Sequence, residues 1–376
     1  MPELVALDMP GGSAFLDALQ RIWEAGDTVL PVDQRLPNVA KESLFGALKP
    51  GAVIDRTGRR VVLPGGVATE PGDAVVIATS GTTGIAKGVI LTHDALLASA
   101  AASSRRLAVD PHRDRWFGCL PVAHIGGFSV ATKALLTDTP LTLRPNFDAA
   151  EVDDASSQHT LVSLVATALG RVRMDSWRAI LLGGSAMPDD LPPNVVRTYG
   201  LTETGSGLVY DGICVDTAEV RCLDGNIEVR GPMLFRAYRS GYPQGTVALD
   251  PDGWFSTGDA GSTEVDGRLR VFGRTGDVIV TGGEKVWPDA VERALRDFAA
   301  VREVAVAGRP DPEWGHRVVA WVVPADPDQP PSLEAVREHV KQTMPSYAAP
   351  KSVVIVDQLP RTAIGKVQRT QLPDVG

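Results

Sequence analysis

Apolar runs alternate with amphipathic stretches through the first 200 residues of the chain. The runs have the length and the polar flanks of buried strands, and they lie at 73–80, 115–121, 140–144, 179–183 and 194–199. Stretches with helical spacing lie at 93–107, 127–137 and 159–170. Thr92 or His93 stands at the expected start of the first helix. The alternation predicts an α/β fold, in which helices cover parallel sheets.

The pattern changes at about residue 212. Short β-like runs split by glycine and aspartate continue to about 272 and predict a β-rich subdomain. A second region follows, with expected strands at 277–283, 301–308, 317–324 and 351–357 and expected helices at 288–299 and 332–343. This region has the size of a compact α+β domain. The pattern therefore predicts two domains, at 1–274 and 275–376.

Composition and charge narrow the function classes. Of the 376 residues, 44% are hydrophobic and 22% are charged, which is typical of a globular protein. The net charge of −9 argues against a broad nucleic-acid surface. No apolar run is long enough to cross a bilayer, and the N-terminus lacks the layout of a signal peptide. Three cysteines without ligand-like spacing favour free thiols in the cytoplasm.

The segment VVIATSGTTGIAKGVILTH, at 75–93, is the strongest candidate for chemistry. An apolar strand runs into a loop of small residues with hydroxyl groups, free backbone N–H groups and the cation Lys87. Such a loop is suited to holding phosphate groups. It is not a Walker P-loop, because Ala86 and Gly88 stand where that motif requires glycine and serine or threonine.

Five motifs, in this order, resemble those of the adenylate-forming enzymes, which include acyl-CoA ligases, peptide-synthetase adenylation domains and luciferases. They are the loop at 75–93, YGLTE at 199–203, STGD at 256–259, GRTGD at 273–277 and PRTAIGK at 360–366. The resemblance implies a large N-terminal domain and a small mobile C-terminal domain. Only about 75 residues precede the phosphate loop, so the front end is expected to be abbreviated.

The resemblance also implies the reaction and its cofactors. A carboxylic acid would be joined to the α-phosphate of ATP with the help of Mg²⁺, and coenzyme A would then take the acyl group. Nothing in the chain suggests a nucleophile of its own, which favours an external thiol. ATP would be bound by Thr79, Ser80, Gly81, Thr82, Thr83, Gly84, Lys87, Gly183, Gly184, Ser185, Ala186, Tyr199, Gly200, Asp259 and Arg274.

Within this set the resemblance gives individual roles. Glu203 and Thr202 would hold Mg²⁺, and an ionised Asp259 would accept hydrogen bonds from the ribose hydroxyls. Lys366 would bridge the acid and the α-phosphate during adenylation. For the turn at 183–186, a plain passage from strand to loop explains the residues almost equally well.

A rotation of the small domain would replace the Lys366 loop with TGGEK, at 281–285. Gly282 and Gly283 would then line the path of the pantetheine arm of coenzyme A, although an ordinary turn is a fair alternative. Family members usually carry Asp or Lys at the pivot, where this chain has Gly276. Without a side chain at the pivot, tight latching of either state is not expected.

The acid is the least determined substrate. The stretch PVAHIGGFS resembles the acyl-pocket motif, and it places His124, Gly126 and Gly127 at the carboxylate site. Gly205 and its small neighbours in RTYGLTETGSGLVYDG, together with the short chain, resemble the compact o-succinylbenzoate–CoA ligases of menaquinone biosynthesis. The second carboxylate of such a dicarboxylate needs a nearby cation or several hydrogen-bond donors. The candidates, in order, are Arg144, then Lys133 and Arg197.

Two other functions stay open at this point. The first is another aryl- or acyl-CoA ligase, or an enzyme that loads a carrier protein. The second is an adenylate-binding protein without catalysis, which the motif residues Glu203, Asp259, Arg274 and Lys366 argue against. A homodimer is a possible assembly.

Overall fold

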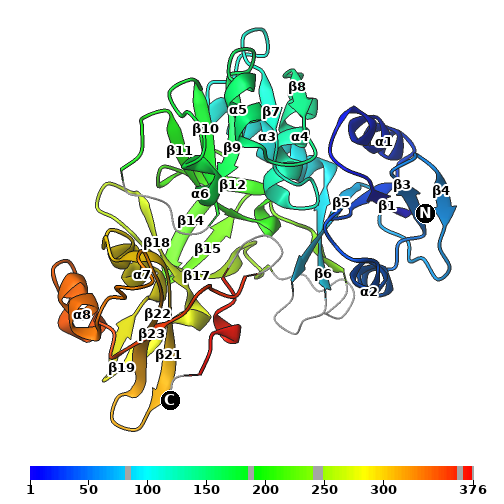
Figure 1. Ribbon diagram of the computed structural model, residues 1–376. Coiled ribbons are helices and arrows are strands. Elements are labelled where there is room, and N and C mark those ends of the chain that lie inside the picture. The colour runs from blue at the N-terminus through cyan, green and yellow to red at the C-terminus, as the bar shows by residue number, and fades with distance from the viewer. Residues whose placement is uncertain (81–85, 185–189, 240–248, 362–366, 375–376) are drawn as a thin grey trace. The chain divides into compact units, whose positions relative to one another are not determined.

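The computed structural model describes residues 1–80, 86–184, 190–239, 249–361 and 367–374 (Figure 1). The chain divides into two compact units. The large unit comprises Met1–Arg221, Glu228–Thr257 and Glu264–Leu269, and the small unit comprises Cys222–Ile227, Gly258–Thr263 and Arg270–Gly376. The predicted α/β class, with a large N-terminal and a smaller C-terminal part, is confirmed. The boundary between residues 274 and 275 stays a prediction.

A mixed seven-stranded sheet contains the strand that precedes the phosphate loop. Its order is β16-β6-β5-β2-β1-β3-β4. The strands are β1 (Leu4–Asp8), β2 (Thr28–Pro31), β3 (Ala52–Asp55), β4 (Arg60–Val62), β5 (Asp73–Ser80), β6 (Ala86–Thr92) and β16 (Ala237–Arg239). Helices α1 (Ser13–Glu24) and α2 (Asn38–Leu48) connect its first strands. Because β5 and β6 pair antiparallel, the phosphate loop connects two neighbouring strands.

A second seven-stranded sheet has the order β13-β12-β11-β10-β9-β7-β8. Its strands are β7 (Trp116–Gly118), β8 (Leu141–Leu143), β9 (Leu161–Val165), β10 (Ala179–Gly183), β11 (Val195–Leu201), β12 (Ser206–Tyr210) and β13 (Ile213–Cys214). The strands from β8 to β11 are parallel, as predicted, whereas β12 and β13 are antiparallel. The associated helices are α3 (His93–Arg106), α4 (Ile125–Leu136), α5 (Ala149–Ala155) and α6 (Ala166–Leu169).

The predicted helix at 159–170 is wrong over its first half. Residues Leu161–Val165 form the buried strand β9, and only Ala166–Leu169 are helical. A short apolar run satisfies both the strand and the helix pattern, so periodicity alone cannot separate them. The pairing of β9 with β7 and β10 in the sheet decides for the strand.

The start of α3 agrees with the sequence. The Thr92 hydroxyl accepts a hydrogen bond from the Ala95 N–H at 3.1 Å, and so caps the helix. The helix runs from His93 to Arg106, close to the expected span.

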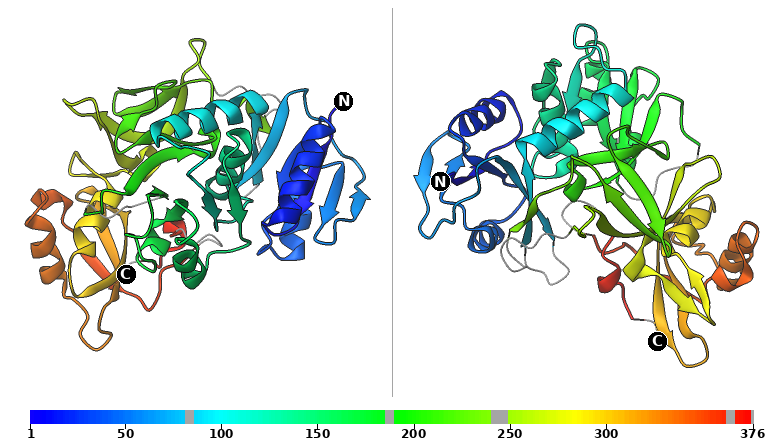
Figure 2. Two further views of the ribbon diagram at one scale, coloured as in Figure 1. Left: turned by 90° about the horizontal axis from the view of Figure 1, so that it is seen from above. Right: turned by 180° about the vertical axis from the view of Figure 1, so that it is seen from behind.

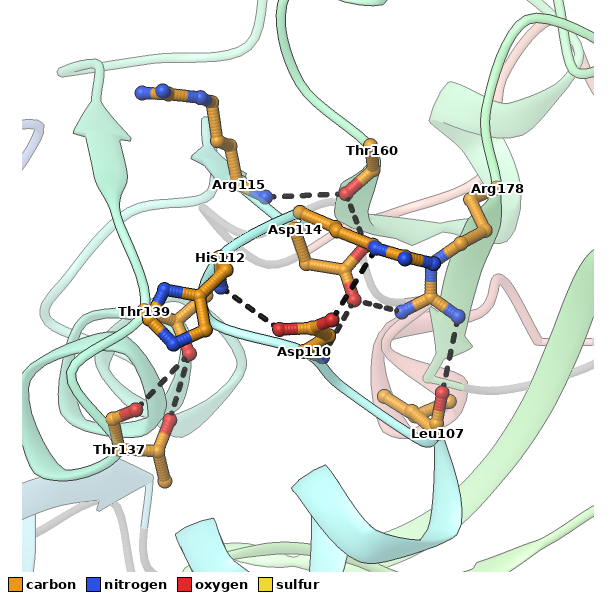
Figure 3. Close-up of polar contacts among 10 residues, drawn as sticks. Leu107, Asp110, His112, Asp114, Arg115, Thr137, Thr139, Thr160 and Arg178 are labelled. Atoms are coloured by element: carbon orange, nitrogen blue, oxygen red, sulfur yellow. Dashed lines mark hydrogen bonds and ion pairs between the residues drawn. The ribbon is translucent and has the colours of Figure 1, made fainter.

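An ion pair between the buried Asp114 and the partly exposed Arg178 fixes the connection between α3 and β7 (Figure 3). The Asp114 carboxylate receives two hydrogen bonds of 2.7 Å from Arg178, and it also accepts from Thr160 and from the Asp110 N–H. Burial opposes the charge of Asp114, but these donors outweigh burial and lower its pKa. Because every oxygen is satisfied, we assign this network a structural role.

A four-stranded sheet has the order β14-β15-β17-β18. Its strands are β14 (Glu219–Leu223), β15 (Asn226–Arg230), β17 (Phe255–Thr263) and β18 (Leu269–Arg274). They confirm the predicted β-rich stretch at about 212–272.

The rest of the small unit is a sheet covered by helices (Figure 2). Its strands are β19 (Ile279–Thr281), β20 (Glu284–Val286), β21 (Val301–Asp311), β22 (Gly315–Pro324) and β23 (Ser352–Ile355), and its helices are α7 (Pro288–Arg296) and α8 (Leu333–Lys341). The 3₁₀ turns within the described ranges are η1 (Thr202–Thr204), η2 (Thr275–Asp277), η3 (Ser346–Ala348) and η4 (Arg369–Gln371). Val291, Leu295 and Val336 pack in one core with β22. Among the helices of the described ranges, none has the length and apolar character of a membrane span.

Candidate active site

The two ends of the phosphate loop face each other across strands β5 and β6. Thr79 pairs with Lys87 in register, and the Thr79 hydroxyl donates to the Lys87 carbonyl at 3.2 Å. Ser80 is the last residue of β5. The predicted phosphate ligands Gly81, Thr82, Thr83 and Gly84 lie outside the described residues. The hairpin therefore places Lys87 at the base of the loop.

Lys87 and Glu203, which belong to two different motifs, meet at Tyr238. The Lys87 ammonium lies 3.2 Å from the centre of the Tyr238 ring, and the Tyr238 hydroxyl donates to Glu203 Oε1 at 2.8 Å. Burial lowers the pKa of Lys87, while the charge of Glu203 opposes that change. Lys87, the cation predicted to bind phosphate, and Glu203, the predicted Mg²⁺ ligand, thus contact the same tyrosine.

Tyr238 is a candidate functional residue that sequence reasoning missed. Arg236 on one side makes two hydrogen bonds of 2.8 Å with Asp73. Arg239 on the other side is buried and donates to the carbonyl groups of Leu48, Lys49, Val67 and Ala68. These bonds fix strand β16, and with it the tyrosine. The available signal was an aromatic residue between two arginines in FRAYR.

Glu203 can bind Mg²⁺ as the single carboxylate ligand that the protein provides. Within the described ranges there is no cluster of three or more His, Cys, Asp or Glu side chains that could hold a metal ion. Mg²⁺ does not require such a cluster, because it is usually bound through one or two carboxylates together with substrate phosphates and water. Glu203 lies in the 3₁₀ turn η1 with Thr202, and Gly205 ends that turn with a φ of 66°.

Two of the predicted nucleotide-binding glycines have structural explanations. A Cβ on Gly200 would lie 2.1 Å from the carbonyl oxygen of Ser206, because β11 and β12 approach closely at a bulge after Tyr199. Gly184 has a φ of 95° just after β10, a conformation that favours glycine. Gly183 ends β10, and Ser185 and Ala186 lie outside the described residues. The nucleotide contacts of these residues stay predictions.

His124 lies at the start of α4, next to a charged pair from the front of the chain. Its Nε2 atom is 3.2 Å from Asp33 Oδ2 and 3.0 Å from the Arg35 guanidinium. Arg35 also donates to both Asp33 oxygens, at 2.9 and 2.6 Å. Burial would raise the pKa of Asp33, but the bonds from His124 and Arg35 keep it well below its usual range. Asp33 and Arg35 line a recess together with Ala123, beside the predicted acid site.

The other residues predicted to bind the acid differ in packing and in burial. A Cβ on Gly127 would lie 2.3 Å from the Pro121 carbonyl oxygen, so close packing explains this glycine, whereas Gly126 has more space. Arg144 is half-exposed and forms an ion pair of 3.6 Å with Glu151. Lys133, by contrast, is fully buried.

In the small unit, the predicted ribose ligand Asp259 lies next to Arg274, the predicted contact to ribose or phosphate. Arg274 Nε is 3.1 Å from Asp259 Oδ1, and the Asp259 carboxylate is buried on β17. A ribose diol bound at Asp259 would also lie next to Arg274. Whether they bind it stays a prediction.

Gly282 and Gly283 form the tight turn between β19 and β20. Both have positive φ values, 58° and 85°, as a two-residue hairpin turn requires. Beside this turn is a recess lined by Thr281, Trp314, Arg337, Ser346, Tyr347, Ala349 and Lys351. The Lys351 ammonium lies 3.3 Å from the centre of the Trp314 ring. The turn alone explains the glycines, and the recess adds cationic and aromatic groups next to them.

Lys366 lies outside the described residues, and the residues on either side of 362–366 contact each other. Arg361 and Val367 form a β-bridge, and the Gln368 N–H donates to the Pro360 carbonyl at 2.8 Å. Arg369 then binds Asp277 at 3.0 Å and Glu292 at 2.9 Å. These contacts fix the residues that flank 362–366 to the small unit.

Comparisons with known proteins agree with these motifs. Residues 64–239 match the family of AMP-binding enzymes, and residues 290–366 match the AMP-binding enzyme C-terminal domain. A probable 2-succinylbenzoate–CoA ligase of Mycobacterium tuberculosis is 37% identical over 98% of this chain and 97% of its own length. The 2-succinylbenzoate–CoA ligase of Listeria monocytogenes is 33% identical over 80% of this chain and 70% of its own length.

A solved structure shows the same fold. The o-succinylbenzoate CoA synthetase (MenE) of Bacillus subtilis, in complex with the acyl-adenylate intermediate OSB-AMP, superposes with a TM-score of 0.86 at 26% identity. The match covers 100% of this chain and 88% of that one. With motifs, fold and relatives in agreement, the chain belongs to the AMP-binding, adenylate-forming enzyme family.

Proposed function

We propose that this protein is an AMP-forming ligase that joins 2-succinylbenzoate to coenzyme A in menaquinone biosynthesis. The observation that carries the proposal is the meeting of Lys87 and Glu203 at Tyr238, since it joins a phosphate-binding cation to a Mg²⁺ ligand. The choice of acid is supported by relatives named 2-succinylbenzoate–CoA ligase, one of them 37% identical over 98% of the chain.

The reaction has two balanced steps. A carboxylate oxygen of the acid attacks the α-phosphorus of ATP, the bond from that phosphorus to the bridging oxygen breaks, and pyrophosphate leaves. The sulfur of coenzyme A then attacks the acyl carbon, AMP leaves, and the thiol proton is released. Both reactants of the first step are anions, so the protein acts mainly by neutralising charge and aligning the groups.

The residues take the roles that the motifs imply. Lys87 and the loop that follows Thr79 would hold the β- and γ-phosphates, and Glu203 with Thr202 would hold Mg²⁺, which neutralises phosphate charge when bound. Asp259 would bind the ribose, Arg274 would contact the ribose or a phosphate, and Lys366 would stabilise the charge that shifts during adenylation. His124 would lie at the carboxylate of the acid, held by Asp33 at 3.2 Å.

Coenzyme A is the proposed acceptor in the second step. The hairpin turn at Gly282 lies beside a recess that contains Lys351, Arg337, Trp314 and Tyr347. Cationic and aromatic side chains suit the phosphates and the adenine ring of coenzyme A. Rotation of the small unit between the steps would bring this turn to the acyl-adenylate. Gly276 lies at the proposed pivot, in η2, and a Cβ there would meet no atom within 4 Å.

Fewer observations bear on the cellular compartment and the oligomeric state of the protein. Cys119, Cys214 and Cys222 are free thiols, which suits a reducing compartment, and we propose the cytoplasm. The possible homodimer stays a prediction.

The proposal is tested by CoA-dependent release of AMP from ATP in the presence of different acids. We expect turnover with 2-succinylbenzoate, and little with benzoate or octanoate. Turnover with another acid alone would keep the ligase chemistry and overturn the substrate. Pyrophosphate release without formation of a thioester, even after coenzyme A is added, would overturn the proposed acceptor.

A second expectation concerns Tyr238. In Tyr238→Phe the ring under Lys87 remains, but the hydrogen bond to Glu203 is lost. A hydrogen bond to a charged group is worth about 1.5 kcal/mol or more, so the Mg²⁺ concentration that gives half-maximal pyrophosphate release should rise about tenfold. The measurement is the initial rate against Mg²⁺ concentration at fixed ATP.

Tyr210→Phe is the matched control for that variant. Tyr210 is also buried in the large unit, and its hydroxyl binds Ser103 at 2.8 Å. We expect its Mg²⁺ dependence to match that of the wild type. Equal shifts in the two variants would show that the effect of Tyr238 is not specific to Glu203.

A further inference from the structure

The carboxylate of Asp33 reaches the proposed acid site from the front of the chain. Asp33 follows strand β2, and the Val32 N–H still donates to the Leu7 carbonyl at 3.0 Å, so the sheet fixes the backbone up to this residue. The Asp33 side chain is only 9% exposed, whereas the His124 side chain is 36% exposed. The ring of His124 is therefore held on one side by a buried carboxylate and stays accessible on another.

The two oxygens of Asp33 make different contacts. Aspartate is a frequent turn former, and Oδ1 has this role, because it accepts hydrogen bonds from the backbone N–H and from Nε of Arg35, both at 2.9 Å. Oδ2 lies 2.6 Å from Arg35 Nη2 and 3.2 Å from His124 Nε2. Turn formation thus explains the contacts of Oδ1, but it does not explain why Oδ2 contacts the histidine.

The charge of Asp33 decides which nitrogen of His124 carries a proton. Burial raises the pKa of Asp33, but the bonds from His124 and Arg35 lower it well below its usual range, so Asp33 is a carboxylate at neutral pH. Because a carboxylate only accepts, Nε2 of the ring is the donor in this contact. Arg35 Nη2, at 3.0 Å from Nε2, is itself a donor and is bound by Asp33. The Nδ1 atom makes no hydrogen bond with the residues that the structure describes, and it is the nitrogen left for a ligand.

The start of α4 fixes the backbone of His124. Its carbonyl accepts the first hydrogen bonds of the helix, from the Gly127 N–H at 3.0 Å and the Phe128 N–H at 2.9 Å. A Cβ on Gly127 would lie 2.3 Å from the Pro121 carbonyl oxygen, so α4 begins in direct contact with that backbone. The histidine is therefore fixed at its backbone by α4 and at Nε2 by Asp33, as a residue that must orient a substrate requires.

We propose that Asp33, held by Arg35, positions His124 at the reacting carboxylate of the acid and stabilises the positive charge of its ring. The inference rests on the proposed function, because it concerns the same acid site. An anionic carboxylate needs a donor, so Nδ1 carries a proton when the acid binds, and the ring is then an imidazolium. The charges alternate from Arg35 through Asp33 and His124 to the acid. The imidazolium reduces the repulsion between the acid and the α-phosphate of ATP during adenylation.

The test is a double-mutant cycle of Asp33→Asn and His124→Gln with 2-succinylbenzoate, or with the acid that the wild type prefers to it. Asparagine keeps Oδ1 for the turn but replaces Oδ2 with an NH₂ donor. We expect Asp33→Asn to lower kcat/KM for the acid in pyrophosphate release about 10- to 100-fold, as on loss of one hydrogen bond to a charged group. In the His124→Gln background the same change should cost less than about threefold, because Asp33 acts through the histidine.

Two further measurements separate positioning from a structural role. In Asp33→Asn, the Kd for ATP and the rate of thioester formation from prepared acyl-adenylate should stay within about threefold of the wild type, because the carboxylate has already reacted before the second step. Asp8→Asn is the matched control, since Asp8 accepts a hydrogen bond from Gln34 of the same turn at 2.8 Å. We expect adenylation by this control to match that of the wild type.

The ring nitrogens of His124 test the geometry without turnover, and so keep the inference decisive if Asp33→Asn does not fold. In ¹⁵N spectra of the wild type, at a pH where the ring is neutral, the proton should reside on Nε2. His124→Gln assigns the signals among the six histidines. A proton on Nδ1 in the wild type, or equal losses from Asp33→Asn with and without His124, would overturn the inference, while turnover of 2-succinylbenzoate upholds the proposed function. A wild type that adenylates no acid would overturn both.

Discussion

Replacing Lys366 with alanine is expected to slow acyl-adenylate formation by about 10²–10³-fold, the loss typical when one group that stabilises transition-state charge is removed. ATP binding should change far less, because Lys87 and the phosphate loop remain. The second step should also persist, since in the proposed rotation the loop of Lys366 leaves the site before coenzyme A attacks. The measurements are pyrophosphate release from ATP, and thioester formation from prepared acyl-adenylate and coenzyme A.

The structure supports a local effect of this substitution. The residues that flank 362–366 are joined by the bridge between Arg361 and Val367 and by the hydrogen bond from the Gln368 N–H to the Pro360 carbonyl. Neither contact uses the lysine side chain. Lys341→Ala is a suitable control, because Lys341 is a lysine of α8 in the same unit that pairs only with nearby Glu338 among the described residues. Equal losses in both steps would contradict a role confined to adenylation.

The sequence predicted the fold best where a motif and a hydrophobic pattern coincided. The strand at 73–80 and the helix after Thr92 were found because an apolar run, a small-residue loop and a helix cap occur together. The strand Leu161–Val165 was missed because a five-residue apolar run fits either element. Its identity depends on neighbouring strands that come from distant parts of the chain.

The sequence likewise predicted some residues of the candidate site and missed others. Lys87 and Glu203 were found from motifs, but Tyr238, on which they meet, has no local signal beyond its two flanking arginines. The ranking of Arg144 above Lys133 relied on its place at the end of a strand. That ranking stays a prediction; the structure shows that Lys133 is buried where α4 packs against β12, whereas Arg144 is half-exposed. Sequence spacing alone contains no such information.

Arg369→Met is expected to destabilise the small unit by about 3–5 kcal/mol at neutral pH, as when a buried ion pair loses one partner. The guanidinium binds Asp277 at 3.0 Å and Glu292 at 2.9 Å, and it also contacts Asp289. Urea unfolding, together with hydrogen exchange of α7 and β21, would measure the loss. Arg302→Met, at an exposed position of β21, is the control and should have little effect.

The pH dependence of this loss follows from Glu292. Burial is the main reason why its pKa is raised, and Arg369 opposes that rise. Without Arg369 the pKa of Glu292 should rise further. A carboxyl whose folded-state pKa exceeds the unfolded value stabilises the fold when protonated, and that contribution is lost as pH increases. The difference between variant and wild type should therefore shrink as pH falls from about 7 to about 5. Adding Glu292→Gln to Arg369→Met should recover part of the stability at pH 7, and a difference that is independent of pH would contradict this electrostatic account.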